Sequence, residues 1–176
     1  TKLNLNMALR AALLAALTAV LAQLQLPIGP VPFNLAVLGA FLAGMLLRPA
    51  WAVCSMCVYM ALGVIGIPVF AGFLGGPAVL VGKTGGDVLG YVCIAWCTAM
   101  ARRFGRWWLT AAGMVLGLVL CYALGTVWFM GVTGTSLGQS LAFCVWPFVL
   151  PDACKGACAF AVGAAVERRV LKGAVR

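Results

Sequence analysis

The chain of 176 residues is 65% hydrophobic and only 9% charged, with a mean hydropathy of +1.12 and a formal net charge of +9. A soluble domain usually carries about 25% charged residues, and a single core of this size is too small to hide so much apolar surface. The composition therefore excludes an ordinary soluble domain and indicates that a lipid bilayer covers much of the chain.

Long apolar stretches follow one another along the chain. They are continuous rather than alternating with a period of two, and backbone groups in lipid must bond internally, so we predict helices rather than a barrel. Charges and Pro/Gly clusters divide the chain into six stretches, at residues 7–26, 33–47, 51–67, 86–101, 107–132 and 147–166. We expect one all-α integral membrane domain over residues 1–176, a bundle of six transmembrane helices.

Two of these stretches, 33–47 and 86–101, are shorter than the ~20 residues of a perpendicular span and are candidates for partly re-entrant segments. The first stretch is followed by prolines rather than by a small-residue cleavage site. We therefore expect it to be retained as a helix and not removed as a signal peptide.

The basic residues are distributed unevenly between the predicted connections. Ten of the twelve lie toward the two termini or in the second and fourth connections: Lys2, Arg10, Arg48, Arg102, Arg103, Arg106, Arg168, Arg169, Lys172 and Arg176. Short connections rich in Lys and Arg tend to stay in the cytoplasm, so we predict that both termini are cytoplasmic. Anchoring against anionic lipid accounts for the net charge without a nucleic-acid partner.

Only three residues are acidic, and two of them, Asp87 and Asp152, fall near predicted outer helix ends together with Lys83 and Lys155. A charge inside a bilayer costs at least about 2.5–3.5 kcal/mol, so such residues usually face the protein interior and have a function. In the run Pro-Asp-Ala-Cys-Lys, Asp152 and Lys155 share one helix face. The alternative interpretation is a capped helix start with a neutralising ion pair.

The connection at residues 68–86 is rich in glycine yet strongly apolar, so it can fold down over a cavity instead of projecting into water. Within it, Gly82-Lys83-Thr84 resembles the end of a phosphate-binding P-loop. That motif requires a glycine where this chain has Pro77. Nucleotide binding is therefore discounted, and the absence of histidine also argues against a hard-metal site or a Ser-His-Asp triad.

Eight cysteines occur in the chain, among them the pair Cys54 and Cys57 with the spacing of redox or metal motifs. Cysteine is also a small hydrophobic residue that is commonly buried in helix contacts, and a redox pair normally sits in a polar, accessible setting. Packing between helices is the favoured interpretation, and an intramembrane thiol-redox enzyme is the alternative.

Small residues recur at four-residue spacing, which lets helices approach closely. Gly86 and Gly90 form one such pair, and Gly113 and Gly117 form another. The first helix carries two alanine rows: Ala8, Ala12 and Ala16 in one, Ala11, Ala15 and Ala19 in the other. The rows serve either to pack the bundle or to dock another membrane protein.

Three segments of the chain, taken together, resemble the BioY family. Residues 27–33 read Pro-Ile-Gly-Pro-Val-Pro-Phe, residues 63–76 are glycine-rich and lead to Thr-Gly-Gly at 84–86, and residues 150–155 read Leu-Pro-Asp-Ala-Cys-Lys. Members of this family are the biotin-specific substrate-capture (S) subunits of energy-coupling-factor (ECF) transporters. The resemblance implies six helices, cytoplasmic termini and an outward-facing vitamin pocket.

Biotin carries a ureido ring with N–H donors and a carbonyl acceptor, so its pocket needs both acceptors and donors. The resemblance places the ureido contacts on Asp152 and Lys155. Lys83, Tyr91 and Asn34 are further candidates for completing the pocket, and no cofactor is expected besides biotin as the ligand. Lys83 and Asp87 stand where the family commonly has a proline and an aromatic residue, so we expect Lys83 to pair either with the valerate carboxylate or with Asp87.

The resemblance also implies a mechanism in which the chain captures biotin outside a bacterial inner membrane and reorients within it. A transmembrane coupling subunit and two cytoplasmic ATPase subunits drive this motion, so the chain itself is not expected to be an enzyme. The alanine rows then form the docking surface. Two alternatives remain within transport: an S subunit for another vitamin, and a self-sufficient transporter or channel in which Asp152 and Lys155 line an ion path.

Overall fold

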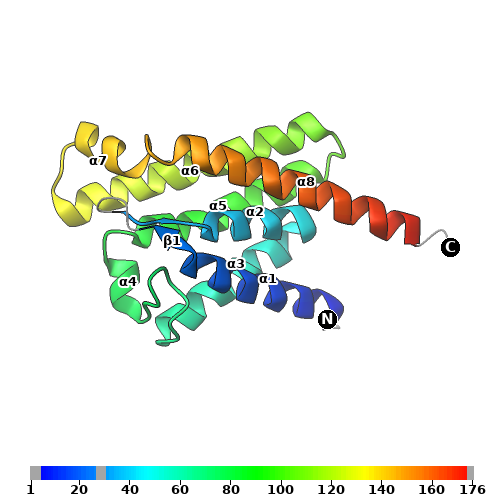
Figure 1. Ribbon diagram of the computed structural model, residues 1–176, viewed down its shortest axis with the longest axis horizontal. Helices are drawn as coiled ribbons and strands as arrows, with labels where there is room; N and C mark the ends of the chain where they lie inside the picture. Colours follow the sequence, from blue (N-terminus) through cyan, green and yellow to red (C-terminus); the bar gives the residue numbers. More distant parts are fainter. Residues whose placement is uncertain (1–4, 27–30, 174–176) are drawn as a thin grey trace.

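The computed structural model describes residues 5–26 and 31–173, and within this part of the chain it is almost entirely helical (Figure 1). The elements, in chain order, are α1 (Leu5–Gln23), β1 (Gln25–Leu26), β2 (Phe33–Asn34), α2 (Ala36–Leu46), α3 (Pro49–Val64), α4 (Pro77–Val81), α5 (Gly85–Arg102), α6 (Trp107–Thr133), α7 (Leu137–Cys144) and α8 (Val149–Gly173). The predicted stretches correspond to α1, α2, α3, α5, α6 and α8. Lys2, Arg176 and residues 27–30 of the first family-like segment lie outside the described residues.

Three helices are long and apolar enough to cross a membrane: α1, α6 and residues Val149–Arg169 of α8. Two further apolar helices, α2 and α3, are shorter, with 11 and 16 residues. The 18 residues of α5 include Asp87 in the first turn and Arg102 in the last. The prediction of an all-helical membrane protein is thus confirmed, with three clear spans.

The sequence missed several short elements. Residues 33 and 34 were assigned to a helix, but they form β2, which pairs antiparallel with β1. The side-chain oxygen of Asn34 accepts a 2.9 Å hydrogen bond from the backbone N–H of Ala36, so the helix begins two residues later than Asn34. Helix α7 was also missed, although Ser136 caps its first turn by accepting from the N–H of Gln139.

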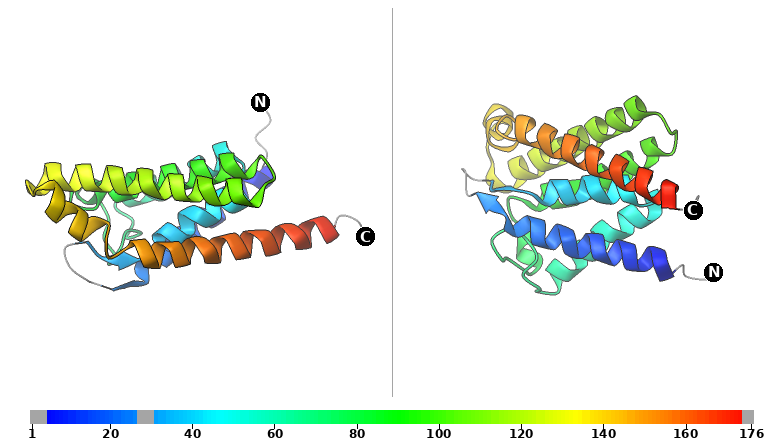
Figure 2. Two further views of the ribbon diagram at one scale, coloured as in Figure 1. Left: turned by 90° about the horizontal axis from the view of Figure 1, so that it is seen from above. Right: turned by 45° about the vertical axis from the view of Figure 1, so that its right-hand side comes forward.

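The first residues of α1 and the last residues of α8 lie at one end of the molecule, whereas β1, α4 and α7 lie at the other (Figure 1). The last turns of α8 extend beyond the neighbouring helices in two views (Figures 1 and 2). The arginines that were predicted to be cytoplasmic gather at the end shared by these two helix termini. Arg10, Arg48, Arg102 and Arg103 line one groove there, and Arg102 pairs with Glu167 at 3.3 Å.

Helix α2 forms the centre of the bundle. Nine of its 11 residues are buried, which is why its sequence is apolar all round. Gly39 lies against Thr18 of α1 and Gly44 against Thr98 of α5, so closely that a Cβ atom at either glycine would overlap its neighbour. These two glycines bring α1 and α5 onto opposite parts of the central helix.

Helices α5 and α6 pack along a seam of small residues. A Cβ atom at Gly117 would lie 2.8 Å from the Cα atom of Ile94, and one at Gly90 would lie 2.8 Å from the Cα atom of Cys121. Gly86 and Gly113 are equally crowded by the facing helix. The prediction that these glycines permit close helix approach is confirmed.

The two alanine rows of α1 have different environments. Ala11 and Ala15 are buried inside the bundle, and the hydroxyl of Ser55 on α3 donates to the carbonyl of Ala11 at 2.9 Å. Ala12 and Ala16 are exposed, and Ala8 is half-buried. The prediction of one broad docking surface is therefore corrected: Ala11 and Ala15 pack within the protein, and only the row of Ala8, Ala12 and Ala16 faces outward.

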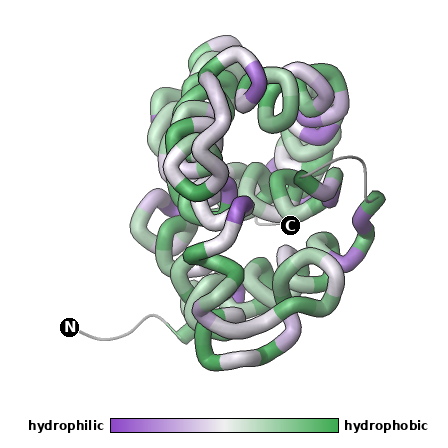
Figure 3. Tube along the Cα trace, turned by 90° about the vertical axis from the view of Figure 1, so that its left-hand side faces the viewer, coloured by the Kyte–Doolittle hydropathy of each residue, from purple (hydrophilic) through white to green (hydrophobic). Residues whose placement is uncertain are grey.

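The outer surface is apolar over much of its area. Leu13 on α1 and Val127 on α6 are each 70% exposed. In the view onto the end that carries β1, α4 and α7, hydrophobic colours predominate along the trace and hydrophilic stretches are short (Figure 3). Such a surface is unfavourable in water, and a bilayer is the solvent that suits it.

Helix α6 supplies a matched pair of glycines to test the seam. We expect Gly117→Ala to lower the free energy of unfolding by about 1–3 kcal/mol, because the added methyl group meets the backbone of α5. A methyl group added at Gly131 would have no atom of another described element within 4 Å, so Gly131→Ala should be neutral or slightly stabilising. Thermal unfolding of the detergent-solubilised protein measures both, and equal effects at the two positions would contradict the seam.

Candidate functional site: a polar cavity at the end of the bundle

One cavity lies toward the end of the molecule that carries β1, β2 and α7. Its empty volume, counted together with the part that opens to solvent, is about 470 Å³. Its lining combines apolar, aromatic and charged residues: Val31, Pro32, Asn34, Val37, Thr84, Asp87, Tyr91, Cys121, Tyr122, Cys144, Phe148, Asp152 and Lys155. The cavity is therefore a candidate binding site with a few polar groups among apolar walls.

Asp152 and Lys155 form a buried ion pair in the first turns of α8. The Nζ atom of Lys155 lies 2.6 Å from Oδ1 of Asp152, and the two side chains are only 5% and 3% exposed. The helix places them on one face because they are three residues apart. Removing two charges from water costs several kcal/mol per ion before any attraction is counted, so this pair is poorly explained as a stabilising contact alone.

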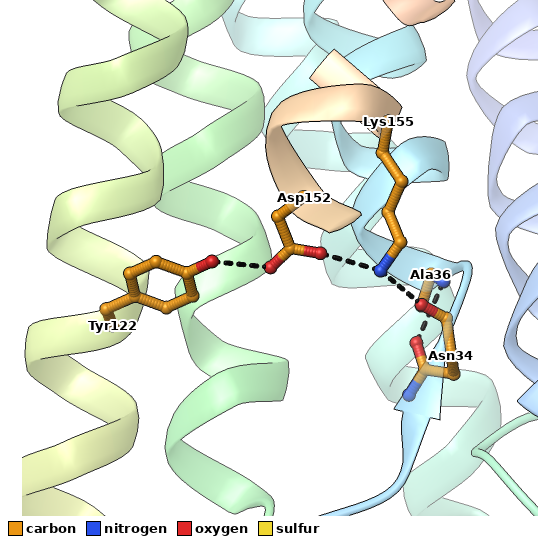
Figure 4. Close-up of polar contacts among 5 residues, drawn as sticks. All are labelled: Asn34, Ala36, Tyr122, Asp152 and Lys155. Atoms are coloured by element: carbon orange, nitrogen blue, oxygen red, sulfur yellow. Dashed lines mark hydrogen bonds and ion pairs between the residues drawn. The ribbon is translucent and has the colours of Figure 1, made fainter. Parts of the chain in front are cut away.

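Two other parts of the chain complete the polar cluster (Figure 4). The hydroxyl of Tyr122 on α6 donates to Oδ2 of Asp152 at 2.8 Å. Lys155 also donates to the backbone carbonyl of Asn34 at 2.6 Å, and its Nζ atom lies 4.1 Å from the ring centroid of Phe33. The ion pair thus connects α8 with α6 and β2.

Tyr122 was not among the residues predicted from the sequence. A signal was present, because it is the single tyrosine in a helix of 27 otherwise mostly apolar residues. A buried tyrosine hydroxyl usually has a hydrogen-bond partner, so this position indicated a polar neighbour. The sequence could not identify Asp152 as that neighbour, because the two residues are 30 positions apart.

The structure brings most of the predicted pocket residues together. Asn34, Tyr91, Asp152 and Lys155 all line the cavity. Lys83 does not: it is exposed in the turn before α5.

The expected pairing of Lys83 with Asp87 is not formed. Among the side chains of residues 5–26 and 31–169, the ion pairs are Arg102–Glu167 and Asp152–Lys155. The helical turn that begins α5 separates the two residues, with Asp87 turned toward Gly125 of α6.

The glycine-rich connection between α3 and α5 packs mainly on the bundle rather than over the cavity. The buried ring of Phe70 makes an edge-to-face contact with Tyr59, with ring centroids 5.6 Å apart. The amide side chain of Gln23 donates to the carbonyl of Phe70 at 3.1 Å and accepts from the N–H of Phe73 at 2.8 Å. Within this connection, Thr84 is the residue that reaches the cavity lining.

The eight cysteines differ in exposure, and Cys93 is half-buried. Cys97, Cys121 and Cys144 are buried, as the packing interpretation expects, and Cys121 and Cys144 line the cavity. Cys54, Cys57, Cys154 and Cys158 are exposed instead, so the packing interpretation is wrong for these four. They lie on helices whose outward faces are apolar, where a thiol behaves as a small hydrophobic group.

The bundle is apolar on its outside and contains a polar cavity near one end. These two features are typical of a membrane protein that binds a small polar molecule between its helices. A family model described as the BioY family matches residues 1–172. The chain belongs to the BioY family.

Relatives and a solved structure agree with this assignment. The chain is 38% identical to a probable biotin transporter BioY of Pyrococcus horikoshii, over 84% of this chain and 88% of that protein. It is 35% identical to the biotin transporter BioY of Thermotoga maritima, over 84% and 87%. The crystal structure of an S-component for biotin from an ECF-type ABC transporter has the same fold, with a TM-score of 0.87, 23% identity and coverage of 96% and 95% of the two chains.

The ion pair also leads to a prediction about the thermal stability of the protein in the absence of ligand. Lys155→Met alone leaves the carboxylate of Asp152 buried without its cation, which typically costs about 3–5 kcal/mol. The double variant Asp152→Asn/Lys155→Met removes both charges, so we expect it to unfold at a higher temperature than Lys155→Met. Thermal unfolding in detergent measures this, and additive losses in the double variant would show that the two charges are not coupled.

Proposed function

We propose that this protein captures biotin at the outer face of a bacterial inner membrane, as the substrate-specific S subunit of an ECF transporter. The observation that carries the proposal is the buried ion pair of Asp152 and Lys155 in the cavity, with its hydrogen bond from Tyr122, on a chain of the BioY family. The names of its relatives and of the solved structure that it resembles support the choice of biotin.

The chemistry of the cavity suits the ureido head of biotin. A protonated Lys155 is a donor for the ureido carbonyl, and the carboxylate of Asp152 is an acceptor for a ureido N–H. Val37 and Phe148 supply apolar surface for the thioether ring. In this proposal Asn34 and Tyr91 complete the lining, and Lys83 at the exposed turn attracts the valerate carboxylate.

The proposed arrangement in the membrane has six spans, α1, α2, α3, α5, α6 and α8, with both termini in the cytoplasm. The position of the arginines at the end shared by the start of α1 and the end of α8 supports it, because Lys and Arg tend to be retained inside. The cavity, at the opposite end, then faces outward.

Transport against a gradient needs an energy source. The chain has no complete P-loop, since Pro77 replaces the first glycine of that motif. We propose that a transmembrane coupling subunit and two cytoplasmic ATPase subunits supply the energy and reorient the protein. The outward row of Ala8, Ala12 and Ala16 is the proposed docking surface, because small side chains let a partner helix approach closely.

Calorimetry of biotin with the purified, detergent-solubilised protein tests the substrate. We expect tight binding by the wild type and a loss of at least about 100-fold for Asp152→Asn and for Lys155→Ala, because truncating one partner of a buried charge pair costs 2–5 kcal/mol or more. Lys83→Ala should weaken binding by about threefold, since its charge is exposed and screened. Absence of heat from correctly folded wild-type protein would reject biotin and direct the test to other vitamins.

The docking surface is tested by replacing outward alanines with a bulky residue. We expect Ala12→Leu or Ala16→Leu to abolish biotin uptake in cells that contain the partner subunits, while calorimetric biotin binding is unchanged. Ala123→Leu on α6 is the matched control, because Ala123 is an exposed alanine on a helix at the opposite side of the bundle (Figure 2). Normal uptake by the α1 variants would reject the alanine row as the docking surface. Uptake in vesicles that contain this chain alone would favour a self-sufficient transporter.

A further inference from the structure

A second carboxylate faces the cavity from α5. Asp87 lies in the first turn of this helix and is part of the cavity lining. Its Oδ2 atom is buried and, within the part of the chain that the structure describes, has no hydrogen-bond partner. Its Oδ1 atom lies directly against Gly125 of α6, where even one added carbon would overlap it. The neighbouring helix therefore limits the movement of the carboxylate, and its buried Oδ2 atom stays unbonded.

The other carboxylate of the cavity, that of Asp152, has a hydrogen-bond donor at each oxygen. Oδ1 of Asp152 accepts from Lys155, and Oδ2 accepts from Tyr122. Lys155 is the cation of the lining, and its ammonium group donates to Asp152 and to the carbonyl of Asn34, which leaves one N–H for a ligand carbonyl and none that reaches Asp87 in the structure. Asp87 is thus the carboxylate in the cavity that still lacks a donor.

An unbonded carboxylate oxygen in a buried position is unfavourable, because the group loses its water and gains no partner in exchange. Buried polar atoms without partners are rare in proteins, and each one calls for an explanation. A ligand that brings an N–H group into the cavity removes the penalty at Asp87. A ligand that brings an anionic group into the cavity increases this penalty by charge repulsion, since the lining already holds two carboxylates and one ammonium.

We propose that Asp87 is a specificity-determining residue that accepts a hydrogen bond from an N–H group on the polar head of the ligand. This inference rests on the proposed function: with biotin, one ureido N–H donates to Asp87 and the carbonyl accepts from Lys155. The site then selects heads with neutral or cationic N–H donors and directs the carboxylate tail away from the two acids.

The test compares two ligands that differ only in the head. Biotin has a neutral ureido group, and 2-iminobiotin has a guanidinium-type group that is cationic at neutral pH and keeps the N–H donors. The cationic head also lacks the carbonyl that accepts from Lys155, so each variant is compared with the wild type for the same ligand. A carboxylate at the contact favours the cationic head more than an amide does, because charge-assisted hydrogen bonds are roughly twice as strong as neutral ones. Binding of both ligands is measured for the wild type, Asp87→Asn and Glu167→Gln. The last variant makes the same carboxylate-to-amide change on an exposed residue at the other end of the bundle.

We expect Asp87→Asn to weaken biotin severalfold and 2-iminobiotin at least about tenfold more than biotin, whereas Glu167→Gln changes neither. Equal losses for the two ligands would show that Asp87 only supports the fold, and unchanged affinities would show that it makes no contact. Either result overturns the assignment of Asp87 while leaving biotin capture intact. No binding of biotin by folded wild type would overturn the proposed function and this inference together. Asp87→Ser, which is smaller and cannot collide with Gly125, repeats the comparison should the Asn variant unfold.

Discussion

The structure depends on one buried interaction, the ion pair between Asp152 and Lys155. Two adjacent turns of α8 carry both charges, but neither charge is satisfied by the other alone. Asp152 needs the hydroxyl of Tyr122 and Lys155 needs the carbonyl of Asn34, so α6 and β2 must lie close to the start of α8. The requirement to satisfy two desolvated charges therefore defines the end of the bundle at which a polar ligand can enter.

The rest of the bundle is apolar and closely packed around this polar cluster. Helix α2 is buried on nearly all sides, and glycines at its contacts with α1 and α5 let the helices approach until little space is left between them. The seam between α5 and α6 is built in the same way. Close packing along the helices leaves open space at the ends of the bundle, and the polar cavity forms at the end where β2, α7 and the first turn of α8 meet.

The two ends of the molecule carry different chemistry. One end holds arginines at the surface, with Arg102 paired to Glu167, and exposed basic groups of this kind suit contact with anionic headgroups. The other end holds the buried ion pair of Asp152 and Lys155, which is shielded from such screening. This division supports a protein that is anchored at one membrane face and binds its ligand from the other.

Much about this protein is determined by the sequence alone. Its composition requires a bilayer, its apolar stretches locate the main helices, and the spacing of Asp152 and Lys155 places them on one face, because all three depend on residues that are near neighbours in the chain. Only the tertiary structure decided that Tyr122 and Asn34 complete the cluster, that Ala11 and Ala15 face inward, and that Asp87 turns toward the cavity while Lys83 stays outside. Those outcomes depend on which face each helix presents to distant helices, and local periodicity in an almost uniformly apolar sequence does not distinguish one face from another.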